Sequence, residues 1–372
     1  MSIKHAEEYR DKKLSRSLIQ EIQKNSRKPV RLMEVCGTHT VSIFKYGIRS
    51  ILPKTISLLS GPGCPVCVTA QGEIDAFIEL SRKKDVIITT FGDLMRVPGS
   101  NSSLQQERAK GQDIRMVYSA FDALEIAKIN PDKEVVFLGV GFETTAPTIA
   151  ASVLSAQVMN LTNFSVISAH KKVVPALTAL LQTKEVNING FLLPGHVSVI
   201  IGAGAYRGFI KNYPIPCVIA GFEPVDILTS IHMLIKQIET GKKDLENAYP
   251  RAVTEEGNSK AKSLLNTVFQ SGNAIWRGIG PIPDSGLFFQ KAYEAFDATR
   301  RFQISYQQTP EPKGCACGEV LTGIKTPLDC TLYKKICTPL HPVGPCMVSS
   351  EGICAAYDKY HVENNRGSCN DD

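Results

Sequence analysis

The residues best suited to chemistry in this sequence are its cysteines, which number 11 in a chain of 372 residues. Six of them share one stretch near the C-terminus that is rich in glycine and proline, at Cys315, Cys317, Cys330, Cys337, Cys346 and Cys354. A loop so poor in apolar bulk needs a cross-link or a metal to order it. Four thiolates bind a 4Fe–4S cluster or a zinc ion. Six thiols therefore fit a cluster plus one dithiol, and a structural zinc site with two spare cysteines is the alternative.

A second thiol pair, Cys64 and Cys67, has the C-x-x-C spacing and stands just ahead of a helix-like stretch over residues 72–83. A helix N-terminus and a neighbouring thiol lower the pKa of a cysteine and favour thiolate chemistry. The same spacing is also half of many zinc sites. Since no second C-x-x-C or H-x-x-x-H lies nearby, we favour a redox or metal-transfer dithiol.

Cys36 and His39 share the polar, turn-forming segment Cys-Gly-Thr-His-Thr at residues 36–40. A lone cysteine behind a buried strand is more often a small core residue. The turn-forming neighbours move Cys36 toward a strand edge instead. The local sequence therefore leaves a functional and a structural role equally open.

Two further histidines and two glutamates also follow apolar runs. His170 and His196, each taken alone, favour structural roles. Glu143 and Glu223 occur in matching Gly-Phe-Glu segments, where a carboxylate can stabilise the start of a helix through its dipole.

Composition narrows the class of protein. Hydrophobic residues at 43% and charged residues at 21% are typical of a globular protein and exclude collagen, long coiled coil and bulk disorder. The net charge of +6 comes without a run of five basic residues, so nucleic-acid binding is not indicated. The charged N-terminus lacks a signal-peptide core, and no apolar stretch is long enough for a membrane span. We therefore expect a soluble, cytoplasmic protein, in which cysteines serve metal or redox chemistry rather than a disulfide framework.

The elements that must position these residues are short apolar runs, most of them without alternation, as strands buried on both faces require. The eight runs are Arg31–Val35, Thr55–Ser60, Asp85–Thr90, Ile114–Ser119, Glu134–Val140, Phe164–Ala169, Gly190–Leu193 and Ile215–Ala220. Helix-like stretches separate them at Gly72–Lys83, Ala120–Lys128 and Pro147–Met159, and the first 28 residues have an amphipathic helical pattern. This alternation predicts an α/β fold with doubly wound parallel sheets.

The two series of four runs predict two tandem Rossmann-like domains of similar fold, over residues 1–128 and 129–240. Helical spacing over Leu228–Ala248 and Glu255–Trp276 then leads into the cysteine-rich end. We place a smaller, loop-rich iron–sulfur domain at residues 241–372. The polar tail Glu363–Asp372 is expected to be frayed, which makes Cys369 incidental.

Most of the unusual residues follow the predicted strands. In open parallel sheets, ligands bind beyond the carboxyl ends of the strands. Two sheets with such edges facing each other would form a cleft lined by thiols, imidazoles and carboxylates.

Taken together, the motifs resemble those of the hydrogenase maturation factor HypD family along nearly the whole chain. The resemblance rests on the segments at residues 36–40, 61–67, 141–147 and 194–198 and on all six C-terminal cysteines. Several long motifs in the same order are far more specific than a single C-x-x-C.

The resemblance implies a scaffold on which the iron of [NiFe]-hydrogenase receives two cyanides and one carbon monoxide, as Fe(CN)2(CO), together with the small chaperone HypC and the cyanide donor HypE. Cys36 would hold this iron opposite the N-terminal cysteine of HypC, with His39 and His196 in matching motifs as further site residues. The family's 4Fe–4S cluster and adjacent disulfide imply two groups here. Cys315, Cys330, Cys337 and Cys354 would be the cluster ligands, Cys317 and Cys346 the disulfide, and Cys64 and Cys67 the second redox pair.

The physical logic agrees, because a soft thiolate suits low-spin iron, and a dithiol stores the two electrons that cyanide release requires. We expect a redox-active scaffold, monomeric on its own, rather than a stand-alone turnover enzyme. An autonomous ferredoxin-dependent thiol–disulfide oxidoreductase and a non-redox protein with structural zinc are the alternatives.

Overall fold

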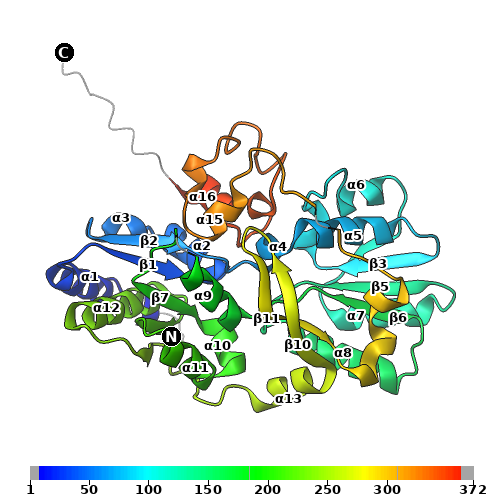
Figure 1. The fold of residues 1–372 in the computed structure, drawn as a ribbon, viewed down its shortest axis with the longest axis horizontal. Coiled ribbons are helices and arrows are strands. Elements are labelled where there is room, and N and C mark those ends of the chain that lie inside the picture. The colour runs from blue at the N-terminus through cyan, green and yellow to red at the C-terminus, as the bar shows by residue number, and fades with distance from the viewer. Residues whose placement is uncertain (1–7, 184, 308, 362–372) are drawn as a thin grey trace.

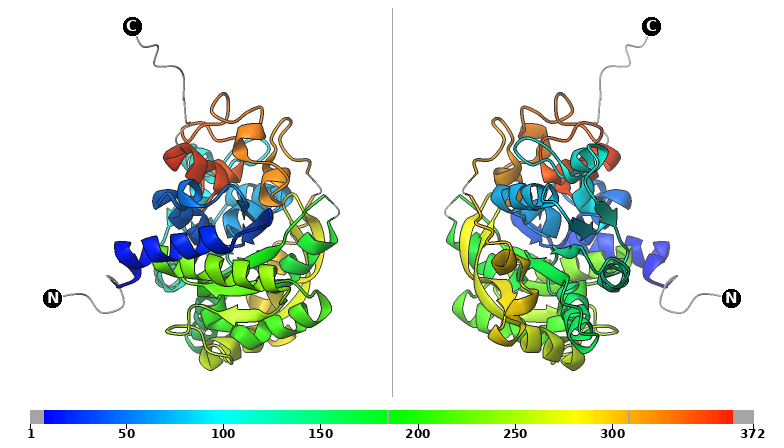
Figure 2. Two further views of the ribbon diagram at one scale, coloured as in Figure 1. Left: turned by 90° about the vertical axis from the view of Figure 1, so that its left-hand side faces the viewer. Right: turned by 90° about the vertical axis from the view of Figure 1, so that its right-hand side faces the viewer.

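The computed structural model of the chain describes residues 8–183, 185–307 and 309–361. Figure 1 shows two sheets side by side, with a long hairpin between them and the C-terminal segment lying over them. Figure 2 shows the same C-terminal segment, in orange and red, on one side of the molecule in both views. Cys369 and the polar tail lie outside the described residues.

The first sheet has five strands in the order β2-β1-β7-β8-β9, all parallel. These strands are β1 (Val30–Glu34), β2 (Ile56–Ser60), β7 (Gly190–Pro194), β8 (Cys217–Ala220) and β9 (Leu245–Asn247). The second sheet has four parallel strands in the order β4-β3-β5-β6. They are β3 (Val86–Thr90), β4 (Ile114–Met116), β5 (Glu134–Gly139) and β6 (Phe164–Ser168).

All eight predicted strands are present and parallel, which confirms the α/β class. The tandem arrangement is wrong, because β1 and β2 pair with β7 to β9 and not with β3 and β4. The second sheet is thus inserted between β2 and β7 of the first. The predicted boundary after residue 128 falls in the last turn of α7 (Ala120–Ile129), which connects β4 to β5 within the second sheet.

The predicted amphipathic N-terminal helix is α1 (Lys12–Asn25), which the Asp11 carboxylate caps by accepting the backbone N–H of Lys13. Together with α12 (Pro224–Thr240), α1 covers one face of the five-stranded sheet, where Ile22 and Ile231 are fully buried. Helix α12 ends well before the predicted Ala248, because Gly241 adopts a left-handed conformation that terminates it.

The remaining helices connect the strands. They are α2 (Gly37–Lys45), α3 (Ile48–Ile51), α4 (Pro65–Val68), α5 (Gln71–Ser81), α6 (Leu104–Ala109), α8 (Ala146–Val158), α9 (Val173–Gln182), α10 (Gly195–Ile201), α11 (Arg207–Asn212), α13 (Ser259–Val268) and α14 (Ala298–Arg301). Short 3-10 turns complete the connections: η1 (Glu8–Arg10), η2 (Gly92–Arg96), η3 (Ala203–Tyr206) and η4 (Lys291–Phe296).

The helix predicted through Trp276 is correct only as far as α13. From Phe269 onward the chain forms β10 (Phe269–Trp276), which pairs with β11 (Gly280–Phe289) as an antiparallel hairpin. Phe269, Ala274 and Trp276 are buried in it. Their spacing imitates a helical pattern, but antiparallel pairing with β11, the next strand along the chain, decides the structure.

The C-terminal segment is mostly loop, as predicted, with short elements at α15 (Cys317–Leu321), η5 (Pro327–Asp329), η6 (Pro345–Met347) and α16 (Ile353–Tyr360). Helix α16 packs on α2, where Phe44 and Tyr357 meet edge to face at 4.5 Å. One continuous buried core joins both sheets, the hairpin and this segment. Within the described residues, no helix has the length and apolar character that a membrane crossing requires.

Candidate functional site

Each sheet contains one pair of neighbouring strands from which the next strands along the chain are added on opposite sides. In the five-stranded sheet this pair is β1 and β7, and in the four-stranded sheet it is β3 and β5. Loops beyond the carboxyl ends of strands diverge at such a pair and leave a crevice for ligands. Cys36 follows β1 and His196 follows β7, so both residues stand at the crevice of the larger sheet.

The loop that carries Cys64 lies directly against Cys36. The backbone N–H of Gly37 donates to the carbonyl of Gly63 at 3.0 Å. A β-carbon on Gly63 would overlap the backbone nitrogen of Cys36. Only glycine allows this approach, so the two predicted cysteine motifs meet through their backbones.

Cys64 and Cys67 form a disulfide, and both are buried. Cys64 stands at the N-cap of the single-turn helix α4, where its sulfur accepts the backbone N–H of Cys67 at 3.1 Å. The predicted helix over 72–83 is α5, which is separated from α4 by a break at Thr69 and Ala70. The pair therefore begins its own short turn and does not stand at the mouth of the longer helix.

The thiol of Cys36 lies at the N-cap of α2 and is 8% exposed. Burial, followed by the charges of Glu351 and Glu34, raises the pKa of this thiol to about 12. A free Cys36 therefore keeps its proton at neutral pH. It becomes a strong ligand only when a metal ion displaces that proton.

Glu34 is a site neighbour that sequence reasoning missed. Its carboxylate is fully buried and accepts the backbone N–H of Cys36 at 3.3 Å and the hydroxyl of Thr40 at 2.5 Å. Burial raises its pKa to about 7. A charged residue inside an apolar strand was the available signal, because such a group is rarely buried without a specific partner.

Glu351 is a second missed neighbour, and it comes from the C-terminal segment. The Glu351 carboxylate accepts the Thr38 hydroxyl at 2.6 Å. A β-carbon added to Gly37 would lie 2.5 Å from the β-carbon of Glu351. Nearby, Asp93 of the second sheet accepts the hydroxyl of Ser349 at 3.1 Å. The C-terminal segment therefore contacts the edges of both sheets at Cys36.

His39 and His196 lie on either side of the Phe222 ring, at centroid distances of 4.6 Å and 3.8 Å. His39 is buried, and its Nε2 contacts the carbonyl of Gly221 at 2.9 Å. Burial lowers the pKa of His39 to about 4, so the imidazole is neutral at physiological pH. His196, stacked on the same ring, is exposed. The structure thus brings both histidines to the same crevice as Cys36.

His170, Glu143 and Glu223 have structural partners. His170 Nδ1 contacts the Ser168 hydroxyl at 3.0 Å. Glu223 stands at the N-cap of α12, but its carboxylate forms an ion pair with Arg10. Glu143 caps α9, not the helix that follows it, by accepting the backbone N–H of Val173 at 3.0 Å. A carboxylate bonded at a helix start is thus found for Glu143 alone, and on a different helix from the expected one.

Glu143 also predicts how stability depends on pH. Burial raises its pKa from 4.5 to about 7, so the folded chain holds a proton that the unfolded chain releases. The contribution of Glu143 to stability should therefore fall as pH rises from 4.5 to 7, by up to about 3 kcal/mol. Glu143→Gln keeps an acceptor for the Val173 N–H and should remove this contribution, so that the free-energy difference between wild type and variant changes with pH in urea unfolding between pH 5 and 8. The exposed Glu79→Gln is the control, and an equal change there would contradict the assignment.

All six C-terminal cysteines line one small pocket in the C-terminal segment. Cys317 and Cys346 form a close pair within it, with their sulfur atoms 3.1 Å apart. A β-carbon on Gly344 would approach the Cys315 sulfur to 3.1 Å, so the loop closes tightly over the thiols. In the part of the chain that the structure describes, no three His, Cys, Asp or Glu side chains are placed to hold a single metal ion. The division into four ligands and one pair stays a prediction.

The two cysteine sites are joined at the tip of the β10–β11 hairpin. Helix α4, which ends the Cys64–Cys67 motif, packs on η6, which carries Cys346. The Arg277 side chain donates from Nε to the carbonyl of Thr69 at 2.9 Å. Its neighbour Gly278 lies against the backbone of Gly318, directly after Cys317. The hairpin tip thus contacts both cysteine-bearing turns.

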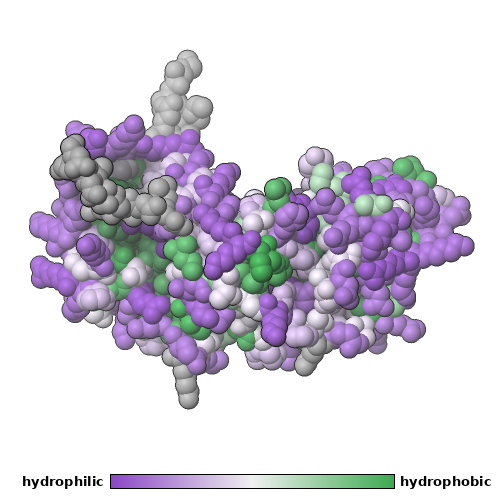
Figure 3. Space-filling model, turned by 90° about the horizontal axis from the view of Figure 1, so that it is seen from above, coloured by the Kyte–Doolittle hydropathy of each residue, from purple (hydrophilic) through white to green (hydrophobic). Residues whose placement is uncertain are grey.

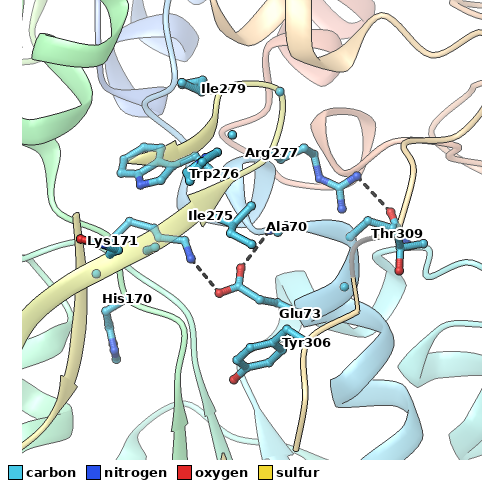
Figure 4. Close-up of a pocket in the computed structure, with 18 of the residues that line it drawn as sticks. Ala70, Glu73, His170, Lys171, Ile275, Trp276, Arg277, Ile279, Tyr306 and Thr309 are labelled. Atoms are coloured by element: carbon cyan, nitrogen blue, oxygen red, sulfur yellow. Dashed lines mark hydrogen bonds and ion pairs between the residues drawn. The ribbon is translucent and has the colours of Figure 1, made fainter. Parts of the chain in front are cut away.

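A pocket of about 640 Å³ lies beside the same hairpin. Figure 4 shows Lys171 and Glu73 pointing toward one another across it, and they form a buried ion pair at 2.7 Å. Arg277 pairs with Glu311 at 2.5 Å on the far wall. Because each of these buried cations is neutralised within the chain, we assign both pairs a structural role: Lys171 ties the segment after β6 to α5, and Arg277 ties the hairpin tip to the loop that carries Glu311.

Comparison with known proteins supports one family. The family model described as "HypD: Hydrogenase formation hypA family" matches residues 13–361. The chain is 45% identical over 370 residues to a hydrogenase maturation factor HypD of Rhodobacter capsulatus, covering 96% of this chain and 98% of that protein. HypD of Cupriavidus necator is 44% identical over 368 residues (96% and 97% covered), and HypD of Escherichia coli is 41% identical over 369 residues (97% and 99% covered). The chain therefore belongs to the HypD family of hydrogenase maturation factors.

Proposed function

We propose that this chain is the scaffold on which the Fe(CN)2(CO) group of [NiFe]-hydrogenase is assembled, together with a HypC-type chaperone and a HypE-type cyanide donor. Cys36 is the anchor for the incoming iron, and the N-terminal cysteine of the chaperone is the ligand opposite it. The observation that carries this proposal is the position of Cys36 at the sheet crevice, against the Cys64–Cys67 loop and beneath Glu351. A soft thiolate in that position suits low-spin iron with strong-field ligands.

The C-terminal cysteines fit a resident 4Fe–4S cluster. Cys315, Cys330, Cys337 and Cys354 would hold it, leaving Cys317 and Cys346 as a redox pair. The common pocket and the short Cys317–Cys346 sulfur distance support this division. The four thiolates of a cluster each bind a different iron and need not converge on one point, whereas a zinc ion requires convergence. The cluster, when bound, supplies electrons one at a time.

The remaining redox steps belong to the chain's own thiols. Cyanide carried as a thiocyanate, R–S–CN, is released as R–SH and HCN when two electrons and two protons are added. A dithiol supplies the two electrons and the two protons and becomes a disulfide. We infer that the Cys317/Cys346 dithiol reduces the Cys64–Cys67 disulfide by thiol–disulfide exchange, and that the resulting dithiol acts beside Cys36. The packing of α4, which carries Cys67, on η6, which carries Cys346, supports this order of electron transfer.

Infrared spectroscopy of the chain purified anaerobically with its small partner tests the scaffold. We expect cyanide and carbonyl bands, together with visible absorption and about four irons from the cluster. A colourless protein with stoichiometric zinc would instead support the structural-zinc alternative. Turnover of a generic disulfide substrate by the isolated chain, without such a complex, would support an oxidoreductase.

The proposed transfer of electrons from Cys317/Cys346 to Cys64/Cys67, called the relay below, makes a separate prediction. In Cys64→Ser/Cys67→Ser, hydrogenase maturation should fall at least about tenfold, because the two-electron store beside Cys36 is lost. Partner binding and cluster absorption should persist, since neither depends on this pair. Hydrogenase activity in a complemented deletion strain, with pull-down of the small partner, measures both. Normal maturation in the double variant would show that the relay is wrong.

A further inference from the structure

A groove of about 500 Å³ runs beside the C-terminal cysteines and is not used by the proposed assembly reaction. One wall is apolar and comes from the loop after Cys330, with Ile336, Leu340 and Val343. The other wall comes from η2 and α6. Ile336 is 64% exposed and Leu340 is 85% exposed. Figure 3 looks onto the face that carries the C-terminal segment, where green apolar surface interrupts the hydrophilic surface. Exposed apolar side chains gathered at a groove indicate a surface for a partner.

The groove reaches one of the proposed cluster ligands through a single hydrogen bond. The backbone N–H of Val343, a lining residue, donates to the sulfur of Cys337 at 3.3 Å. Ile336 is the residue immediately before Cys337. A protein seated in this groove would therefore lie directly beside the proposed iron–sulfur site. Since electron tunnelling slows steeply with distance, an electron donor has to dock at such a place.

Positive charges flank the apolar wall of the groove. Lys334 and Lys335 stand exposed in the turn between two proposed ligands, and within the described residues no carboxylate pairs with either. The Arg96 guanidinium holds the carbonyl of Pro339 at the rim. The opposite wall has two carboxylates: Glu107 of α6 is buried and engaged by Arg82, and Asp93 of η2 accepts the hydroxyl of Ser349. The rim therefore attracts an acidic protein surface.

We propose that this groove is the docking surface for an acidic protein that carries one electron. The proposal rests on the proposed function, because it supplies the electrons that the cysteine relay consumes. Each docking event delivers one electron to the chain, and the carrier leaves in its oxidised form. Two such events, with two protons from solvent, convert the Cys317–Cys346 disulfide to the dithiol.

The test uses cluster-loaded full-length protein and a plant-type [2Fe–2S] ferredoxin as the acidic probe. Stopped-flow absorbance gives the rate of reduction by reduced ferredoxin, and calorimetry with oxidised ferredoxin gives its affinity. We expect Lys334→Glu/Lys335→Glu to lower the second-order rate constant and the affinity about tenfold at low ionic strength. Added salt should slow the wild type and leave the variant nearly unchanged. Leu340→Asp should weaken affinity as well, without disturbing the fold, because the side chain is exposed.

Lys243→Glu/Lys260→Glu is the matched control, since both lysines are exposed, Lys243 in the loop after α12 and Lys260 in α13, and Figure 1 shows both helices away from α6. Equal losses in the two double variants, or no loss in either, would overturn the docking surface. Reduction by dithionite reports on the iron–sulfur site without docking and should be the same in every variant. If dithionite bleaches nothing, the proposed function fails, while the calorimetric affinities still decide the docking surface.

Discussion

Replacing Cys36 by alanine is expected to abolish hydrogenase maturation while leaving the chain folded. Under the proposed function, Cys36 is the only ligand that this chain commits to the incoming iron at the crevice. Disturbing residues that merely orient a ligand costs 10- to 100-fold in metal affinity, so removing the ligand itself should cost at least about 100-fold. The side chain is small and its cavity is shallow, so the free energy of unfolding should fall by only about 1 kcal/mol.

Cys217→Ala provides the matched control, because Cys217 is a free cysteine buried in β8 of the same sheet. Both variants lose one buried thiol, and both should unfold in urea with similar small losses. Only Cys36→Ala should lose the cyanide and carbonyl infrared bands of the purified complex and the hydrogenase activity of a complemented strain. Retention of those bands in Cys36→Ala would remove Cys36 from the centre of the assembly reaction.

The strands and the place of the motifs were predictable from the sequence. Runs such as Val86–Thr90 and Glu134–Gly139 are buried along nearly their whole length, so only continuous apolar sequence can form them. The chemistry follows at their carboxyl ends because the loops there diverge at the switch point of a parallel sheet and leave a crevice for ligands. That rule alone is enough to place Cys36 and His196 at the carboxyl edge of a sheet.

The nesting of the second sheet within the first was not predictable. It depends on the pairing of β1 with β7, where Leu32 lies beside Gly190. Each strand is apolar on both faces, so its local pattern is compatible with many neighbours. A tandem order and a nested order therefore have the same local signature. The choice between them is made by contacts distant in the sequence.

The roles of Glu34 and Glu351 were hidden for a related reason. Glu351 reaches Thr38 from the far end of the chain, and no local spacing reports such a contact. Glu34 did carry a signal, as a carboxylate in an apolar strand. Its meaning depends on Thr40 and the Cys36 backbone, which surround it only after α2 has folded back on β1.

The contact between the hairpin tip and α15 gives the second large prediction. Gly278 has a φ of +75°, a left-handed conformation that costs an L-residue about 1–2 kcal/mol. A β-carbon there would also overlap the Cα of Gly318, which belongs to backbone and has no side chain to move aside. Forcing extra bulk into a packed contact costs a further ~1–3 kcal/mol. Gly278→Ala must therefore push the hairpin away from the turn that begins at Cys317.

Gly280 separates the two costs, because it has a φ of +93° in the same turn, but a β-carbon added to it would meet nothing within 4 Å. Gly280→Ala should lose only the conformational part, and Gly278→Ala should lose both. Urea unfolding measures the difference, and hydrogen exchange should show faster opening of the C-terminal segment in Gly278→Ala alone. Under the proposed relay, this variant should also slow reduction of the Cys64–Cys67 disulfide, since the hairpin tip joins α4 to the C-terminal cysteines. Equal destabilisation by the two substitutions would mean that the tip does not hold the cysteine-bearing turns together.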